Sequence, residues 1–165
     1  MSWSLFKTKC MVLVGGTHIS IPQFAQTIAD AYHQAVSLHF DSMTAGGRIV
    51  NNSPKFPILY QQILQQCQAN NTQNNQIQFI QQLAPYIINY WVGLSIIGPT
   101  GSVAVLNPGT FVGVPVVQNT NFNIMLDAMV MSFRTHIMTI TGVYVSSVVP
   151  GVTSPWSGAL LQSLP

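Results

Sequence analysis

Only eight of the 165 side chains carry a formal charge, five of them Lys or Arg and three of them Asp, and the chain contains no Glu. This is 5% of the residues, whereas about a quarter of an ordinary globular chain is charged. The polar positions are filled instead by 26 carboxamides, 15 Gln and 11 Asn. A neutral polar surface hydrogen-bonds well but resists self-association weakly. The composition therefore favours a subunit of a large assembly over a membrane-associated or a secreted protein.

The small number of charged residues also limits the kinds of partner that this chain can bind. The five basic residues are scattered along the chain and form no stripe that could neutralise phosphates, so nucleic acid is not expected as the primary partner. A membrane-spanning helix needs about 20 mostly apolar residues. The most apolar window, 77–97, is interrupted by three Gln, Pro85 and Asn89. We therefore interpret it as a buried helix and expect no membrane partner.

The length fits one domain over residues 1–165. Apolar spacings of three and four residues predict a mainly α fold, a small bundle of about four helices with a β-hairpin or β-arm insertion and an extended C-terminal arm. The expected segments are an N-terminal lead-in (1–19), a helical part (20–97), a β-arm (98–118), a long helix (119–142) and an extended C-terminal arm (143–165).

Start and stop signals place the helices. Ser20 followed by Pro22 predicts a helix to about residue 41, and Ser53 followed by Pro54 predicts a second helix to about residue 70. A third helix is expected to end near residue 97, with Pro85 either bending it or starting a new one. The most regular stripe lies in 119–142, after a cap at residues 119–121 and before the stop at Gly142.

Fourteen of the 22 residues in 61–82 are Gln or Asn. The apolar residues between them keep helical spacing, so these amides are interpreted as the outward faces of packed helices and not as a low-complexity segment.

Two segments are candidates for contact with a partner. Residues 102–106 and 110–117 read as two strands around a turn at 107–109, with Pro115 restricting the second run to a sheet edge. Residues 143–165 are uncharged and carry Trp156 and several leucines, so they are expected to lie on a protein surface, their own or a neighbour's. The candidate partner contacts are Val103, Val105, Phe111, Val114, Val149, Trp156, Leu160, Leu161 and Leu164.

Catalytic patterns are sparse. Asp30 and His33 are spaced i, i+3 and could form an acid/base pair or part of a metal site, but no third ligand stands near them in the sequence. His18, His39 and His136 match no ligand pattern. Cys10 and Cys67 are interpreted as two small buried hydrophobic residues. We therefore expect no enzyme, no cofactor and no metal; a small enzyme using Asp30 and His33 is the alternative.

The combination of a small helical domain, a β-arm, an uncharged tail and an amide-rich surface resembles the small structural proteins of virus particles, especially those of tailed bacteriophages. The resemblance rests on the composition and the order of segments of the whole chain and not on a motif. It implies a non-enzymatic, homo-oligomeric subunit of a capsid, neck, tail or baseplate, made in the host cytoplasm, located in the virion and contacting other virion proteins. The alternatives are a peripheral membrane or pore-associated protein, because of the apolar stretch at 83–97, and a small secreted binding domain.

Overall fold

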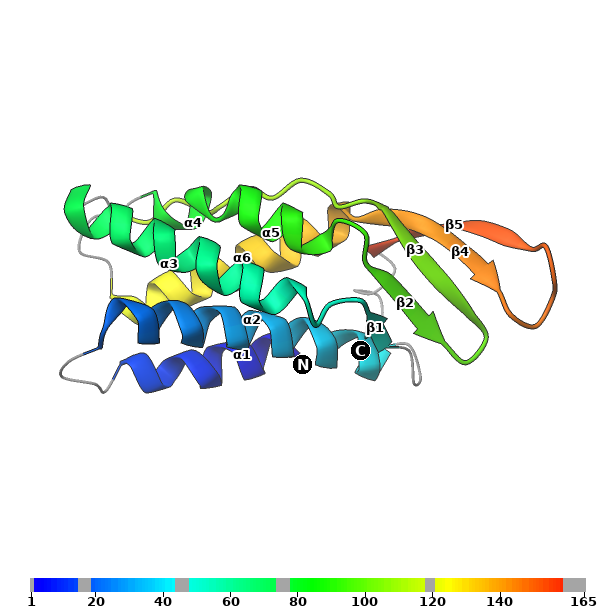
Figure 1. Cartoon of the computed structure of the whole chain (residues 1–165), viewed down its shortest axis with the longest axis horizontal. Coiled ribbons are helices and arrows are strands. Elements are labelled where there is room, and N and C mark those ends of the chain that lie inside the picture. The colour runs from blue at the N-terminus through cyan, green and yellow to red at the C-terminus, as the bar shows by residue number, and fades with distance from the viewer. Residues whose placement is uncertain (1, 15–18, 44–47, 74–77, 118–120, 159–165) are drawn as a thin grey trace.

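The computed structural model describes residues 2–14, 19–43, 48–73, 78–117 and 121–158. A helical body occupies one end of the molecule, and a twisted antiparallel sheet projects from the other end (Figure 1). The helices are α1 (Ser2–Cys10), α2 (Ile21–Met43), α3 (Lys55–Gln73), α4 (Phe79–Gln82), α5 (Ala84–Trp91) and α6 (Phe122–Thr139), with a 3-10 turn at Met11–Leu13. The strands are β1 (Arg48–Val50), β2 (Ser95–Gly98), β3 (Gly101–Asn107), β4 (Thr141–Ser146) and β5 (Thr153–Ser157), and they neighbour one another in that order.

The expected helix bundle with a small hairpin is wrong, because the chain is a mixed α/β protein with a five-stranded antiparallel sheet. The expected strand at 102–106 is present within β3, but its partners are β2 and β4. Residues 95–98, expected as the end of a helix, form β2, and part of the expected C-terminal arm forms the β4–β5 hairpin. Residues 110–117 lie outside any strand.

The N-terminal segment is helical and not an irregular lead-in. Trp3, Phe6, Cys10 and Leu13 are all buried, and they follow one another at spacings of three and four residues. This stripe packs α1 against α2 and α6. The opposite face of α1 is polar, and Lys7 reaches Asp127 of α6 at 2.7 Å.

The capping signals correctly placed two long helices. At the start of α2, the Ser20 hydroxyl accepts a hydrogen bond from the Gln23 backbone N–H (3.3 Å), and at the start of α6 the Asn121 side chain accepts one from the Asn123 N–H (2.8 Å). Pro85 lies in the first turn of α5. It therefore starts a new helix and does not bend an existing one, which was one of the two alternatives expected from the sequence.

Some amide side chains of the segment 61–82 point between the helices. Gln66 of α3 donates to Asn70 (3.1 Å) and to Gln82 of α4 (2.9 Å), and it accepts from the Tyr86 hydroxyl of α5 (3.0 Å). Carboxamides can donate and accept at once, so a single Gln joins three helices here. Not all of these amides are therefore the outward faces that the sequence suggested.

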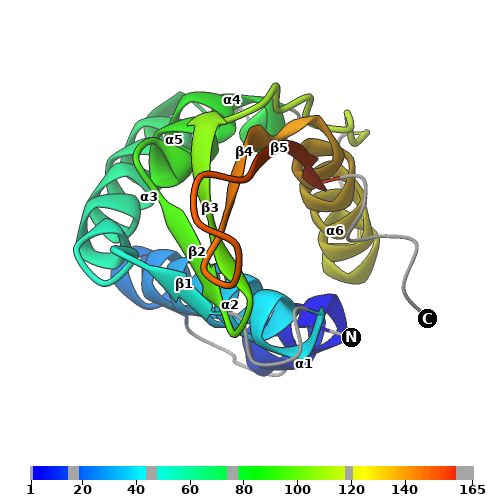
Figure 2. The ribbon, with the colours of Figure 1, turned by 90° about the vertical axis from the view of Figure 1, so that its right-hand side faces the viewer.

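The helices stand around a shared hydrophobic core, and β2 to β5 leave this core along the long axis of the molecule (Figure 2). Residues 108–117, which follow β3, form neither helix nor strand, and we call them the strap. Three side chains of α6 hold its backbone. His136 Nε2 lies 2.8 Å from the Pro108 carbonyl oxygen, the Thr139 hydroxyl accepts from the Thr110 N–H (2.8 Å), and the Ser132 hydroxyl accepts from the Val114 N–H (2.9 Å).

The three holding residues are spaced i, i+4, i+7 and therefore share one face of α6. They bind the strap backbone along the helix, so the strap lies fixed against α6 although it has no regular structure. The strap also passes close to α4, where Gly113 lies beside the backbone of Ile80 and Gln81.

Replacing Gly113 by alanine is expected to lower the free energy of unfolding by about 1–3 kcal/mol, because the added methyl overpacks the site. Its Cβ would stand 2.5 Å from the Gln81 backbone nitrogen and 2.7 Å from the Ile80 carbonyl carbon, and backbone cannot give way cheaply. Urea unfolding measures the loss. Val112→Ala, on the same strap but 64% exposed, is the control and should change stability by less than about 0.5 kcal/mol. Equal losses in both variants would contradict the packing of Gly113.

Candidate functional site

Strands β2 to β5 of the projecting sheet carry no charged side chain. We call residues 95–107 and 141–158, which contain β2 to β5 and the turns between them, the β arm. It contains no Asp, Glu, Lys, Arg or His. The helical body, in contrast, carries the ion pairs Lys7–Asp127 and Lys9–Asp30. The arm is therefore uncharged along its whole length, unlike the helical body.

The base of the arm is anchored in the core. Burial alternates along β3, with Val103 and Val105 buried on the face toward the helical body, as the two-residue period of a strand requires. Ile96 of β2 is buried beside them. At the end of β5, Gly158 donates its N–H to the Ile140 carbonyl oxygen (2.9 Å), which ties the arm to the end of α6.

The far end of the arm is held together by hydrogen bonds between its two turns. The Thr100 carbonyl oxygen, in the β2–β3 turn, accepts from the Tyr144 hydroxyl (2.6 Å) and from the Ser147 N–H (3.0 Å). Gly101 makes room for Tyr144, since a Cβ there would stand 2.5 Å from the tyrosine ring. These bonds join the β2–β3 turn to the β4–β5 turn, so the two turns form one unit.

The β4–β5 turn has its own internal support. The Ser146 hydroxyl accepts from the backbone N–H groups of Val148 (3.2 Å) and Val149 (3.1 Å), and the Ser146 N–H donates to the Val152 carbonyl oxygen (3.0 Å). Gly151 adopts a φ of 81°, a conformation that favours glycine. The turn thus holds its valines in defined positions.

Those valines point away from the core. We call the exposed apolar residues at this end of the arm the apolar tip; they are Ile97, Val145, Val148, Val149 and Val152, which are 42–68% exposed. Single exposed valines are ordinary on protein surfaces, but five exposed apolar side chains at one charge-free, hydrogen-bonded end are suited to contact. The apolar tip is the surface on which we base the functional proposal.

The candidate contacts from the sequence are distributed over several places. Val103, Val105 and Phe111 are buried in the chain's own core and are not exposed to a partner. Val149 is 52% exposed in the apolar tip. Val114 is half-buried in the strap, and Trp156 is half-buried against the core. Leu160, Leu161 and Leu164 lie outside the described residues.

Sequence reasoning missed four members of the apolar tip, all but Val149. A signal for two of them was present, because Val148 and Val152 flank the turn-forming pair Pro150-Gly151 and lie where the chain reverses. No comparable signal existed for Ile97, which was expected at the end of a helix.

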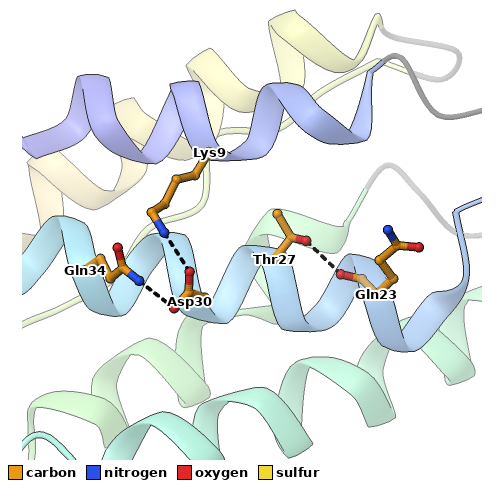
Figure 3. A network of polar contacts seen from close by, with 5 residues as sticks. All are labelled: Lys9, Gln23, Thr27, Asp30 and Gln34. Atoms are coloured by element: carbon orange, nitrogen blue, oxygen red, sulfur yellow. Dashed lines mark hydrogen bonds and ion pairs between the residues drawn. The ribbon is translucent and has the colours of Figure 1, made fainter.

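The Asp30–His33 pair does not show a catalytic arrangement. Asp30 accepts from the Lys9 ammonium (2.9 Å) and from the Gln34 side chain (2.8 Å), as Figure 3 shows. The same close-up shows the Thr27 hydroxyl donating to the Gln23 carbonyl oxygen of the same helix. His33 pairs instead through Nδ1 with the Tyr90 hydroxyl (2.8 Å). Both carboxylate oxygens of Asp30 thus serve to fix α1 and α2.

The electrostatics of these groups suit structure better than proton transfer. Burial lowers the pKa of His33, against the opposing influence of Asp30, so its neutral form is favoured. Burial also raises the pKa of the Tyr90 hydroxyl, which stays protonated. His18 lies outside the described residues, and the side chain of His39 is not described.

Burial also makes the two cysteines unreactive. Burial raises the pKa of Cys10 to about 12 and that of Cys67 to about 11, so neither forms the nucleophilic thiolate near neutral pH. Both are free thiols. Within the described ranges, no group of three His, Cys, Asp or Glu side chains could hold a metal ion.

Among the helices that the structure describes, none combines the length and the apolar character needed to cross a membrane. Comparisons of the chain with models of protein families, with curated proteins and with solved structures found no match.

Proposed function

We propose that this protein is a non-enzymatic structural subunit of a large assembly, such as the capsid, neck, tail or baseplate of a virus particle, and that it acts through subunit contacts. The observation that carries the proposal is the β arm, which projects from the helical body, carries no charge and ends in the apolar tip. The neutral, amide-rich composition of the chain supports the same function, because such a surface tolerates permanent contact.

The apolar tip favours binding for two energetic reasons. Each 100 Å² of apolar surface removed from water contributes about 2.5 kcal/mol before the costs of association. Ordering costs at an interface are smaller when the contact residues are already held in place. The hydrogen bonds accepted by the Thr100 carbonyl and the Ser146 hydroxyl hold the tip before any partner arrives, so less of the burial energy is lost in ordering it.

Replacing both Val148 and Val149 by serine is expected to abolish concentration-dependent assembly. Light scattering at several protein concentrations should show an oligomer for the wild-type chain and a monomer for the double variant, since two exposed apolar side chains are lost from the contact. Thermal unfolding of the double variant should stay close to that of the wild type, because both valines lie outside the core.

The control is Val12→Ser, which removes a valine that is 66% exposed on the helical body and not on the arm. This variant should assemble like the wild type. A wild-type chain that stays monomeric at every concentration would overturn the proposal. Flotation of the wild type, but not of the double variant, with neutral phosphatidylcholine vesicles would instead assign the tip to a membrane surface.

A further inference from the structure

A second apolar surface lies beside the strap. Residues 114–117 of the strap and the side chains of Ile124, Ala128 and Met131 on α6 line a groove of about 370 Å³. Ile124 and Met131 are each 59% exposed, so the groove opens to solvent. We call it the strap groove. The hydrogen bond between Ser132 and the Val114 N–H fixes one wall against the other.

The charge at the strap groove limits what can bind there. Asp127 is the charged residue among those that line it, and its carboxylate is paired with the Lys7 ammonium at 2.7 Å. The groove therefore presents apolar walls and a neutral ion pair. A charged segment that entered it would lose hydration without gaining an opposite charge. An apolar, uncharged segment would leave no charge unpaired.

The apolar tip meets this requirement and lies at the other end of the molecule. The strap groove lies along the N-terminal half of α6, whereas the arm begins after the C-terminal end of that helix and extends away from it (Figure 1). The hydrogen-bonded arm therefore holds its own tip away from its own groove. Only the tip of another copy can reach it.

We propose that the apolar tip of one copy binds in the strap groove of a second copy. This inference rests on the proposed function and names the first partner, which is the chain itself. The contact is head-to-tail, because it joins two different surfaces, and such contacts generate rings when the rotation closes and filaments when it does not. Each molecule then offers one tip and one groove to its neighbours.

Cross-linking between two variants, each with one added cysteine, tests the contact. One protein carries Val149→Cys in the tip and the other carries Met131→Cys in the groove, both in a Cys67→Ser background that leaves only the buried Cys10 thiol. Mild oxidation of the mixture should give a disulfide-linked dimer of one copy of each, about tenfold or more above the dimer formed by either variant alone. Val12→Cys in place of Val149→Cys is the matched control and should not cross-link with Met131→Cys.

The outcomes separate this inference from the proposed function. A dimer formed equally well by the Val149→Cys protein alone would show that two tips meet, which overturns the tip-in-groove contact while the assembly function stands. An oligomer by light scattering without any cross-link between positions 149 and 131 would also overturn the contact alone. A monomer at every concentration, without cross-links, would overturn both.

Discussion

Phe133→Ala is expected to lower the free energy of unfolding by about 3–5 kcal/mol, a large part of the 5–15 kcal/mol that holds a typical domain. Phe133 is buried where α1, α2, α6 and the strap meet. Its ring centroid lies 4.8 Å from that of Tyr32, 5.2 Å from Phe6, 5.5 Å from Trp3 and 5.9 Å from Phe111. Alanine leaves a cavity among these four rings, which come from α1, α2 and the strap and cannot all close on it.

Calorimetry should show this loss as a fall in Tm of about 6–20 °C, using the usual shift for a chain of this size. Met131→Ala on the same helix removes a side chain that is 59% exposed and should cost less than about 0.5 kcal/mol. Similar losses for the two variants would contradict the central position of Phe133. Because Phe133 joins α1 to the rest of the core, its truncation also tests whether the N-terminal helix is an integral part of the fold.

Acid should destabilise the protein mainly through a single buried histidine. His136 is fully buried, and its Nε2 lies 2.8 Å from the Pro108 carbonyl oxygen. A carbonyl only accepts hydrogen bonds, so Nε2 carries the proton and Nδ1 is the basic atom. Nδ1 is buried and has no hydrogen-bond partner among the described residues. Burial therefore lowers the pKa of His136 to about 4, while the bond to Pro108 opposes the shift.

The direction in which stability changes with pH follows from the difference between the pKa of His136 in the folded and in the unfolded chain. The unfolded chain binds the proton at a pKa near 6.5, above the value of about 4 in the folded protein, so acid favours the unfolded chain. Stability is complete above about pH 6.5 and falls as the pH drops toward 4. At about 1.4 kcal/mol per pKa unit, the loss approaches about 3 kcal/mol. His33, whose pKa is also lowered, adds to the loss in the same direction.

Urea unfolding at a series of pH values between 7 and 4 measures this loss. His136→Gln keeps a donor for the Pro108 carbonyl but does not titrate, so its stability should depend on pH much less than that of the wild type. His33→Gln is the control and should keep most of the dependence. The chain suits this measurement because it has three Asp and no Glu, which limits the carboxylate contribution. A wild-type stability that stays constant from pH 6.5 to 4 would contradict the burial of a neutral His136.

The strap connects these two stability predictions to the proposed contact. Phe111 packs against both Phe133 and His136, and the next residues of the strap form one wall of the strap groove. Protonation of His136 at Nδ1 keeps the bond to Pro108 but buries a charge beneath the strap, whose Phe111 ring packs on the imidazole. We therefore expect acid to loosen the strap and weaken tip-in-groove binding before the helices unfold.

The elements that could be predicted from the sequence are those whose evidence is local. The caps at Ser20 and Asn121 and the apolar stripe of α6 lie within the helices they define, because a helical hydrogen bond joins residues only four apart. The stripe of α1 was equally local but was not recognised. Seven of the eleven residues from Trp3 to Leu13 are apolar, but the polar run 7–9 divides them, so the segment resembled a lead-in.

The sheet and the apolar tip could not be predicted in the same way. A strand satisfies its hydrogen bonds on another strand, and β3 pairs with β4 across the whole of the strap and α6. The register of that pairing decides which valines are buried: Val103 and Val105 face the core, whereas Val145 is exposed. All three look alike in the sequence.

What the sequence determined by itself is therefore the neutral, amide-rich surface, the start of each long helix and the absence of charge along the arm, since these depend on residue identity and on neighbours a few positions away. Only the tertiary structure decided that residues 95–98 and 141–157 join one sheet, that the strap lies along α6, and that Ile97 lies at the same end of the sheet as the valines of a distant turn. Each of these depends on a hydrogen-bond or packing partner far away in the chain, which local patterns do not specify.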